Sequence, residues 1–305
     1  MEIYLYIAIC LLIIVAYDFF FTVISINGAG LITSMISKGI ARCFLWMNTK
    51  AVNRTILRFS GVAIILALIC WWLGALWIGF FLSLLSDHTA VMDASSATAA
   101  PTIDKFYFSG YMLSTLGNGD FVPGSSGWKV MTAIFSFSGF IFITTGMTYL
   151  ISVSSAVLHK RSLALFIANL LYVKDEGDKV QAVIRNGDQL RNMINKHNQN
   201  HLAYPIVHYF YSTDETTSLA PNLARIDQLL VDALKNNVDS NTLHPLYHSM
   251  NSYLHTVNGT FVKTVGTLSE NENDKLADKD IRKALFKDIL KSDGWDSDIL
   301  KTTSG

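Results

Sequence analysis

The stretch of sequence that decides the fold reads Asp104-Lys-Phe-Tyr-Phe-Ser-Gly-Tyr-Met-Leu-Ser-Thr-Leu-Gly-Asn-Gly-Asp120. Residues 104–114 are aromatic and apolar, which favours a short helix with Asp104 as its N-terminal cap. Residues 115–120 follow directly, and in this interpretation they are extended, because the chain must return from the end of the helix. A helix of this length descends about 16 Å, and six extended residues return about 20 Å. The pattern therefore predicts a re-entrant loop that reaches the middle of a membrane.

Long apolar segments flank this loop. Residues 3–24 contain one charge, Asp18, whereas residues 61–85 and 130–158 contain none. About 20 apolar residues suffice for a helix to cross a bilayer. The whole chain of 305 residues is 50% hydrophobic and only 16% charged, against about 25% charged in ordinary soluble proteins. The sequence predicts an all-α membrane protein with three transmembrane helices, and it excludes a disordered or nucleic-acid-binding chain.

The first apolar segment is interpreted as an N-terminal transmembrane anchor, residues 1–25. A cleaved signal peptide is the alternative, but the apolar run is long and no basic stretch precedes it. Cys10, Cys43 and Cys70 lie in or beside the apolar segments, so they predict no secreted disulfide framework.

Charge in the two connecting loops predicts the topology. Residues 26–60 contain five basic side chains and no acidic one, whereas residues 86–127 contain four aspartates and one lysine. The positive-inside rule then places the N-terminus outside and the C-terminus in the cytoplasm of a multi-pass plasma (inner) membrane protein. Apolar residues at i+4 spacing make residues 26–60 a basic amphipathic linker, either on the inner membrane surface or packed against neighbouring helices.

The backbone of the re-entrant loop must be buried in protein or line water, because lipid satisfies no hydrogen bond. Gly117 and Gly119 free the backbone, so that successive carbonyls can point the same way and replace the hydration shell of a cation. One strand supplies too few oxygens. Several identical chains are therefore expected around one axis.

Residues 115–120, Thr-Leu-Gly-Asn-Gly-Asp, resemble the filter motif Thr-Val-Gly-Tyr-Gly-Asp of the tetrameric potassium-channel family. A β-hairpin turn at Asn118-Gly119 is the alternative. The resemblance covers residues 104 to about 158, and more loosely the span from Gly61. It implies a homotetramer in the lipid bilayer. The implied pore module, 61–158, comprises an outer helix 61–86, a pore helix 104–114, a filter 115–120 and an inner helix 128–158.

The resemblance also assigns roles to single residues. The implied ion-binding residues of the filter are Thr115, Leu116, Gly117, Asn118 and Gly119. The implied support behind the filter comes from Asp120, Tyr111, Tyr107 and Phe108. Asn118 departs from the family, which has an aromatic residue at this position, and Tyr111 occupies a position that is glutamate in some members. Potassium is the expected permeant ion, and sodium permeation stays open.

The inner helix carries two further candidate features. Gly139 lies where the family places its bending glycine, with Gly146 as a second candidate, although close helix packing is the alternative role for both. Thr144, Thr148 and Ser152 fall on one face and either line a cavity or bond back to their own helix.

Residues 159–305 are expected to form a cytosolic all-helical domain with helices near 176–199, 219–236, 245–265 and 275–291. The pairs His197/His201 and His244/His248 have the i,i+4 spacing that suits a metal or a pH sensor. No cysteine joins them, so no metal is assigned beyond permeant monovalent cations. The ligand or partner of this domain stays unknown.

The sequence therefore predicts a passive tetrameric cation channel that conducts potassium, without cofactor or catalytic residue. One alternative is a non-selective sodium/potassium channel. The other is a membrane-anchored sensor or adaptor that signals through the helical domain. An enzyme is not expected, because the spans contain no paired carboxylates, no nucleophile with a base and no metal cluster.

Overall fold

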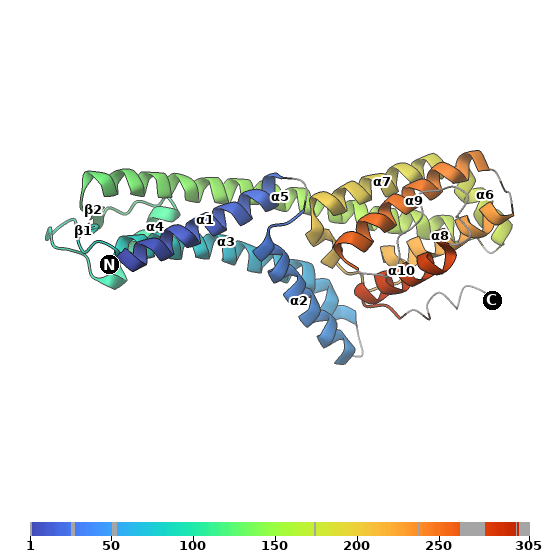
Figure 1. Cartoon of the computed structure of the whole chain (residues 1–305), viewed down its shortest axis with the longest axis horizontal. Helices are drawn as coiled ribbons and strands as arrows, with labels where there is room; N and C mark the ends of the chain where they lie inside the picture. The colour runs from blue at the N-terminus through green and yellow to red at the C-terminus, as the bar shows by residue number, and fades with distance from the viewer. Residues whose placement is uncertain are drawn as a thin grey trace. The chain divides into compact units, whose positions relative to one another are not determined.

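The computed structural model describes residues 2–25, 28–50, 54–173, 175–236, 238, 240–262, 278–296 and 298. The chain divides into two compact units. The first unit comprises Met1–Lys38 and Ala63–Ser152, and the second comprises Gly39–Val62 and Val153–Gly305. Helices dominate both units (Figure 1).

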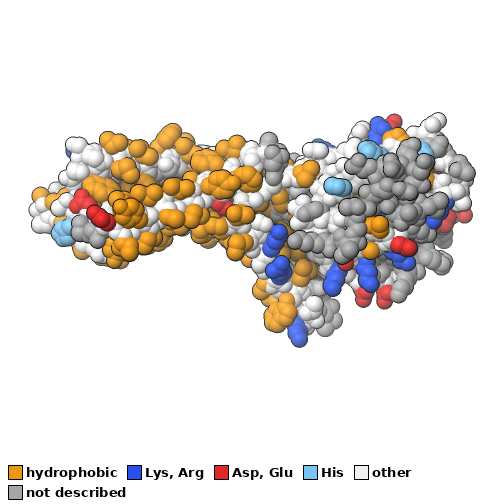
Figure 2. All heavy atoms as spheres, viewed as in Figure 1, with side chains coloured by type: hydrophobic (Ala, Val, Ile, Leu, Met, Phe, Trp, Pro, Cys, Tyr) orange, Lys and Arg blue, Asp and Glu red, His pale blue; other side chains and the backbone are white. Residues whose placement is uncertain are grey.

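The first unit contains the long apolar helices. These are α1 (Glu2–Ile24), most of α3 (Ser60–Leu85) and the first part of α5 (Ser126–Leu170), and the short helix η1 (Arg54–Phe59) precedes α3. Each of the three long segments has an 18-residue window that is apolar enough to cross a membrane, and the protein buries only 22–33% of each window. Figure 2 shows hydrophobic side chains covering this part of the surface. The prediction of an all-α membrane protein with three transmembrane helices is confirmed.

Aromatic side chains pack the three helices of the first unit against one another. Phe19 of α1 stacks on Phe142 of α5 at 4.0 Å between ring centroids. Phe80 of α3 stacks on Phe135 of α5 at the same distance. Stacked aromatic pairs stabilise a structure by about 0.5–1.5 kcal/mol beyond their buried area. These contacts hold α1 and α3 to the helix that follows the re-entrant loop.

Asp18, the one charge in α1, lies buried among donors. Its Oδ1 accepts from the backbone N–H groups of Ile32 (3.0 Å) and Thr33 (3.1 Å), in the first turn of α2 (Leu31–Lys50). Its Oδ2 accepts from the Thr33 hydroxyl at 2.7 Å and from the indoles of Trp71 and Trp72 at 3.3 and 3.2 Å. The carboxylate therefore caps the N-terminus of α2 and ties α1 to α3.

The segment between α3 and α5 contains a small sheet that the sequence did not predict. Strands β1 (Val91–Asp93) and β2 (Phe121–Pro123) pair antiparallel, with Met92 opposite Val122. This pairing anchors the chain directly after residues 115–120.

Helix α4 (Thr102–Leu113) begins two residues earlier than the sequence indicated. The predicted cap by Asp104 is wrong, because Pro101 holds the N-cap position with φ −65° and ψ 167° and no side chain bonds there. Asp104 instead lies in the first turn, where its charge still suits the helix dipole.

The second unit is a bundle of helices. Its own helices are α6 (Glu176–Arg185), α7 (Gly187–Ala203), η2 (Pro205–Tyr209), α8 (Leu219–Lys235), α9 (Ser240–Thr260) and α10 (Asp278–Ser292). The expected helix 176–199 is in fact two helices, because Asn186 leaves the helical conformation and its side chain bonds the Ala182 carbonyl. The expected start at 245 is also wrong, since α9 begins earlier and contains Pro245.

Helix α5 extends to Leu170, beyond the expected end at 158. Its last turns pack into the core of the second unit through Leu163, Ala164 and Ile167. Deeper in that core, Arg282 pairs with Asp227, bonds Asn251 and lies 4.3 Å from the ring centre of Tyr247. The buried cation thus has partners for its charge and its donors.

Candidate ion-conduction site

The site begins where α4 ends. The backbone N–H of Thr115 donates to the Met112 carbonyl at 3.1 Å, and that of Leu116 donates to the Tyr111 carbonyl at 2.9 Å. These two bonds satisfy carbonyls in the last turn of α4. They fix the start of residues 115–120, here termed the filter segment, to the end of the helix.

The filter segment alternates between two backbone conformations. Thr115, Gly117 and Gly119 have φ of +60°, +59° and +86°, whereas the intervening residues do not have positive φ. When left-handed and right-handed backbone conformations alternate, the rotations between successive peptide planes cancel. Neighbouring carbonyls can then lie on one side of the chain. Positive φ suits glycine but costs of order 1–3 kcal/mol at a residue such as Thr115. Such strain is common at functional sites, and among the described non-glycine residues Ala97, outside this segment, also has a positive φ, of +54°.

The described part of the chain leaves the filter segment uncovered. Residues 114–120 are all exposed, and the Leu116 side chain is 67% exposed. Peptide groups at membrane depth need partners from protein or water. The described residues of the single chain do not supply such cover.

Tyr107 of α4 links two side chains of the filter segment. Its hydroxyl accepts from the Asn118 amide at 2.5 Å and donates to the Asp120 carboxylate at 3.4 Å. Asn118, which lacks the aromatic ring of the family motif, is thus tied to α4 by a hydrogen bond. Sequence reasoning placed Tyr107 among the supporting residues but did not find this bridge, because the motif gives no sign of which hydroxyl reaches position 118.

Tyr111 supports the end of the filter segment. Its hydroxyl donates to the Phe121 carbonyl at 3.0 Å, while Asp120 contacts Tyr107. The Tyr111 ring lies 5.0 Å from the ring of Tyr107 and 5.4 Å from that of Phe108. Phe108 is fully buried. Three aromatic residues of α4 thus form one cluster behind the filter segment.

Hydrogen bonds also hold α4 to Trp77 of α3 and to the C-terminal end of α3. Trp77 donates from its indole to the Ser109 hydroxyl at 2.9 Å and to the Phe106 carbonyl at 3.2 Å. Lys105 donates to the carbonyls of Leu84 (3.1 Å) and Asp87 (2.6 Å). These bonds position α4 against the end of α3.

Gly139 of α5 lies against the end of α4. A Cβ at this position would stand 2.1 Å from the Leu113 carbonyl oxygen, inside any allowed contact. At Gly146 the nearest atom, on the Phe19 ring, would be 3.9 Å away. The geometry therefore gives Gly139 a close-packing role beside the filter segment.

Thr144, Thr148 and Ser152 lie on α5 with their hydroxyls bonded back to the helix. They donate to the carbonyls four residues earlier at 2.9, 3.1 and 3.1 Å. Thr144 and Thr148 are exposed, and Ser152 is partly exposed. Bonding to the helix leaves each oxygen free to accept a further hydrogen bond.

The predicted histidine pairs lie in the second unit. His197 and His201 are buried, and His201 stacks against His208 at 5.3 Å between centroids. Burial lowers the pKa of His197 and His201 well below the usual value, and it lowers the pKa of His208 to about 3. No group of three metal ligands occurs among the described residues. The arrangement is a neutral aromatic cluster.

Known proteins resemble this chain in the region of the site. Residues 67–155 match the family described as "Ion channel", a range that includes α4, the filter segment and Gly139. The fold and the site thus define a multi-pass membrane protein of the ion-channel class.

A longer alignment relates the chain to the uncharacterized membrane protein YdjJ of Bacillus subtilis (strain 168). The two are 30% identical over 264 residues, which cover 80% of this chain and 75% of that protein. The chain belongs to the family of membrane proteins that includes YdjJ, and residues 67–155 within it match the ion channel family. No solved structure matches it.

Proposed function

We propose that this protein is a homotetrameric potassium channel whose ion-binding sites are the backbone oxygens of the filter segment. The observation that carries the proposal is the alternation of positive φ at Thr115, Gly117 and Gly119. It supports a row of carbonyls along one side of an uncovered segment, which is what replacement of a cation's hydration shell requires. Four such segments around one axis would surround the ion.

In this proposal each residue of the filter segment has a defined task. Thr115 offers its carbonyl and hydroxyl to the innermost ion, and Leu116, Gly117 and Asn118 offer their carbonyls above it. Gly119 closes the outer mouth. The basic linker faces the cytoplasm together with the second unit, and Thr144, Thr148 and Ser152 face the water-filled cavity below the filter.

A channel that passes both potassium and sodium is the second candidate. Asn118 is held to α4 through one hydrogen bond, rather than by the packing of a large ring. A thousandfold ion preference corresponds to only about 4 kcal/mol, so a weaker brace could remove it. Asn118→Tyr, which restores the ring, is expected to raise the potassium/sodium permeability ratio if this candidate is right.

Ion flux from liposomes tests the proposal. The purified full chain, reconstituted in potassium-loaded vesicles, is expected to release potassium. Gly117→Ala should reduce the flux, because alanine at φ +59° is strained by about 1–2 kcal/mol, although open space surrounds its Cβ. Gly74→Ala is the matched control, since its Cβ also meets open space and lies within helix α3.

Two results would contradict the proposal. One is a folded wild-type protein that carries neither potassium nor sodium, which would favour the sensor or adaptor. The other is a Gly117→Ala variant with undiminished flux.

A further inference from the structure

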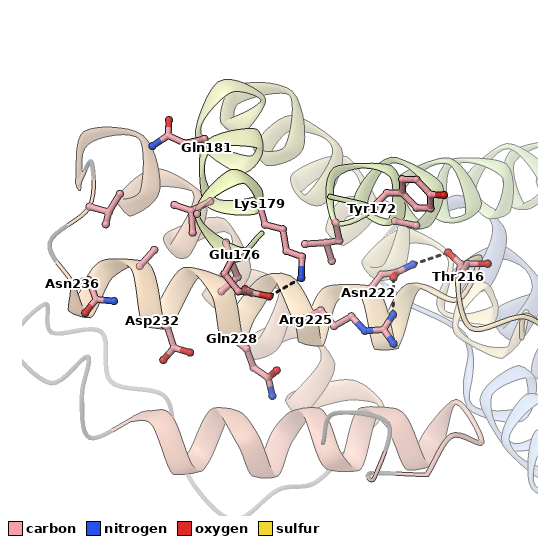
Figure 3. Close-up of a pocket in the computed structure, with 17 residues that line it drawn as sticks. Tyr172, Glu176, Lys179, Gln181, Thr216, Asn222, Arg225, Gln228, Asp232 and Asn236 are labelled. Carbon is pink, nitrogen blue, oxygen red and sulfur yellow. Dashed lines mark hydrogen bonds and ion pairs between the residues drawn. The ribbon is translucent and has the colours of Figure 1, made fainter. Parts of the chain in front are cut away.

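The second unit contains a cavity of about 780 Å³. Its walls come from the end of α5, from α6 and from α8 (Figure 3). Cavities of about 300–1,000 Å³ are typical sites for small molecules. The apolar part of the lining is formed by Ala168, Leu171, Val180, Leu229, Ala233 and Val238.

Two cations in the lining are more buried than the acids that pair with them. The Lys179 side chain is 20% exposed, whereas its partner Glu176, at 2.6 Å, is 71% exposed. The Arg225 side chain is 18% exposed, and its partner Glu215 is 38% exposed. Water screens an exposed charge more than a buried one. The lining holds two cations and two acids, so its formal charge is zero, and the electrostatic potential is positive only close to Lys179 and Arg225.

Arg225 also has unused hydrogen-bonding capacity. Its Nε–H group is buried and has no partner among the described residues. Burial lowers the pKa of its guanidinium, which shows that the charge is poorly solvated. The Nε–H group is enclosed by protein atoms. An anion in the cavity would therefore compensate the poorly solvated charge of the guanidinium rather than bond this group.

The rest of the polar lining is mostly neutral. Amide and hydroxyl groups come from Gln181, Thr216, Asn222, Gln228 and Asn236, and the one further carboxylate belongs to Asp232. At the rim, Tyr172 is 90% exposed and offers a free ring face. Figure 3 shows Gln181 on α6 and Asn222, Gln228 and Asp232 along α8, while Tyr172 lies beside the end of α5. The lining suits a molecule with a hydrogen-bonding, uncharged body.

We propose that this cavity binds a small organic anion, in which one phosphate or carboxylate group is joined to an uncharged polar body. The anionic group takes the place of the Glu176 carboxylate at Lys179, and Arg225 supplies the second positive charge. The body of the ligand contacts the amides of α8. A flat ring in that body stacks on Tyr172.

The position of the cavity links it to the candidate pore. Ala168 lies in the last turn of α5, and Leu171 and Tyr172 follow directly. Helix α5 is continuous from Ser126, so a ligand in the cavity touches the same helix that carries Gly139. Binding is therefore expected to change ion flux. This consequence rests on the proposed function, whereas binding itself does not.

Thermal unfolding of the purified full chain tests binding at constant ionic strength. The probes are AMP for a phosphate, gluconate for a single carboxylate on an uncharged polar body, and inorganic phosphate as a bare anion. AMP or gluconate is expected to raise the melting temperature of the wild type. Lys179→Gln and Arg225→Gln should each lower the affinity for the probe about tenfold. Glu176→Gln, which removes the competing carboxylate, should raise this affinity several-fold.

A matched control lies on α7. Arg191 pairs with Asp188 at the same i,i+3 spacing, at 3.2 Å, but does not line the cavity. Arg191→Gln should leave the effect of the probes unchanged. If Lys179→Gln or Arg225→Gln fails to fold, Glu176→Gln still tests the site, because it retains both cations and is expected to bind the probe more tightly.

The outcomes separate the parts of the proposal. The site would be overturned by equal melting temperatures with and without AMP and gluconate, or by binding that is unchanged in Lys179→Gln and Glu176→Gln. Equal protection by inorganic phosphate would overturn recognition of an organic body. Binding without a change in potassium flux would overturn the link to the pore, while a wild type that carries no ions at all would defeat the proposed function and leave the binding site standing.

Discussion

The Tyr107 hydroxyl accepts a hydrogen bond of 2.5 Å from the side-chain amide of Asn118, eleven residues away and within the filter segment. The same hydroxyl donates to Asp120 at 3.4 Å. One hydroxyl therefore links Asn118 and Asp120 in the second half of the filter segment. Removal of this hydroxyl would release both side chains while the Tyr107 ring stays in the aromatic cluster of α4.

Tyr107→Phe is expected to reduce ion selectivity while leaving the fold intact. A single hydrogen bond contributes about 0.5–1.5 kcal/mol, and 1.4 kcal/mol corresponds to a tenfold ratio. The potassium/sodium permeability ratio should therefore fall a few-fold. Reversal potentials under bi-ionic conditions measure it. Tyr6→Phe, on the exposed face of α1, is the control and should not change the ratio.

Gly139→Ala is expected to destabilise the protein by about 1–3 kcal/mol, the usual cost of overpacking. The new methyl group would overlap the Leu113 carbonyl, which precedes the filter segment. Gly146→Ala should have little effect, because its nearest neighbour is 3.9 Å away. Thermal melting in detergent compares the two variants. Equal melting temperatures for both would show that α5 does not approach α4 closely at Gly139.

Asp18→Leu is expected to detach the start of α2 from α1. The substitution removes an acceptor from two backbone N–H groups, one hydroxyl and two indoles. Buried donors left without partners cost about 1–3 kcal/mol each. The tryptophan emission should change as Trp71 and Trp72 lose their partner. Asp18→Asn keeps one acceptor oxygen and should show a smaller change, and an unchanged melting temperature in Asp18→Leu would contradict the capping role.

Acid is expected to destabilise the second unit through its buried histidines. Their folded-state pKa values are lowered, that of His208 to about 3, whereas an unfolded histidine titrates near 6.5. The unfolded state therefore binds more protons below pH of about 6.5, and stability falls as pH falls toward 3. Each of the three histidines adds to this loss of stability as pH falls through the window.

Two buried acids act in the opposite direction. Burial raises the pKa of Asp227 and Asp293, so their contribution to stability is lost as pH rises above their unfolded value. The histidine effect is therefore read from a comparison of variants. Between pH 7 and pH 5, the melting temperature of the His201→Leu variant should fall less than that of the wild type. An identical pH dependence in the variant would refute the assignment.

Much of the fold could be predicted from hydrophobicity alone, because a bilayer demands long apolar helices. Residues 61–85 are an example, since their span follows from the absence of any charge. The partners of Asp18 could not be predicted in this way. They lie on α2 and α3, and no local pattern indicates which donors a buried carboxylate will find. The break at Asn186 was missed because the hydrophobic periodicity continues across it.

Only some features of the candidate site could be predicted from the sequence. Gly117 and Gly119 indicated in the sequence that the backbone could adopt positive φ, since only glycine does so freely. The positive φ of Thr115 and the bridge by Tyr107 carry no such signal. The cavity beside Lys179 and Arg225 was also invisible in the sequence, because its lining comes from three helices and its residue types are ordinary for a solvated surface.

The most direct test of the central claim is a cryo-electron microscopy map of the purified protein in potassium. We predict four copies around one axis, with the carbonyls of residues 115–118 facing that axis and ion density between them. A map in which residues 115–120 face lipid or solvent at the periphery of the particle would contradict the account.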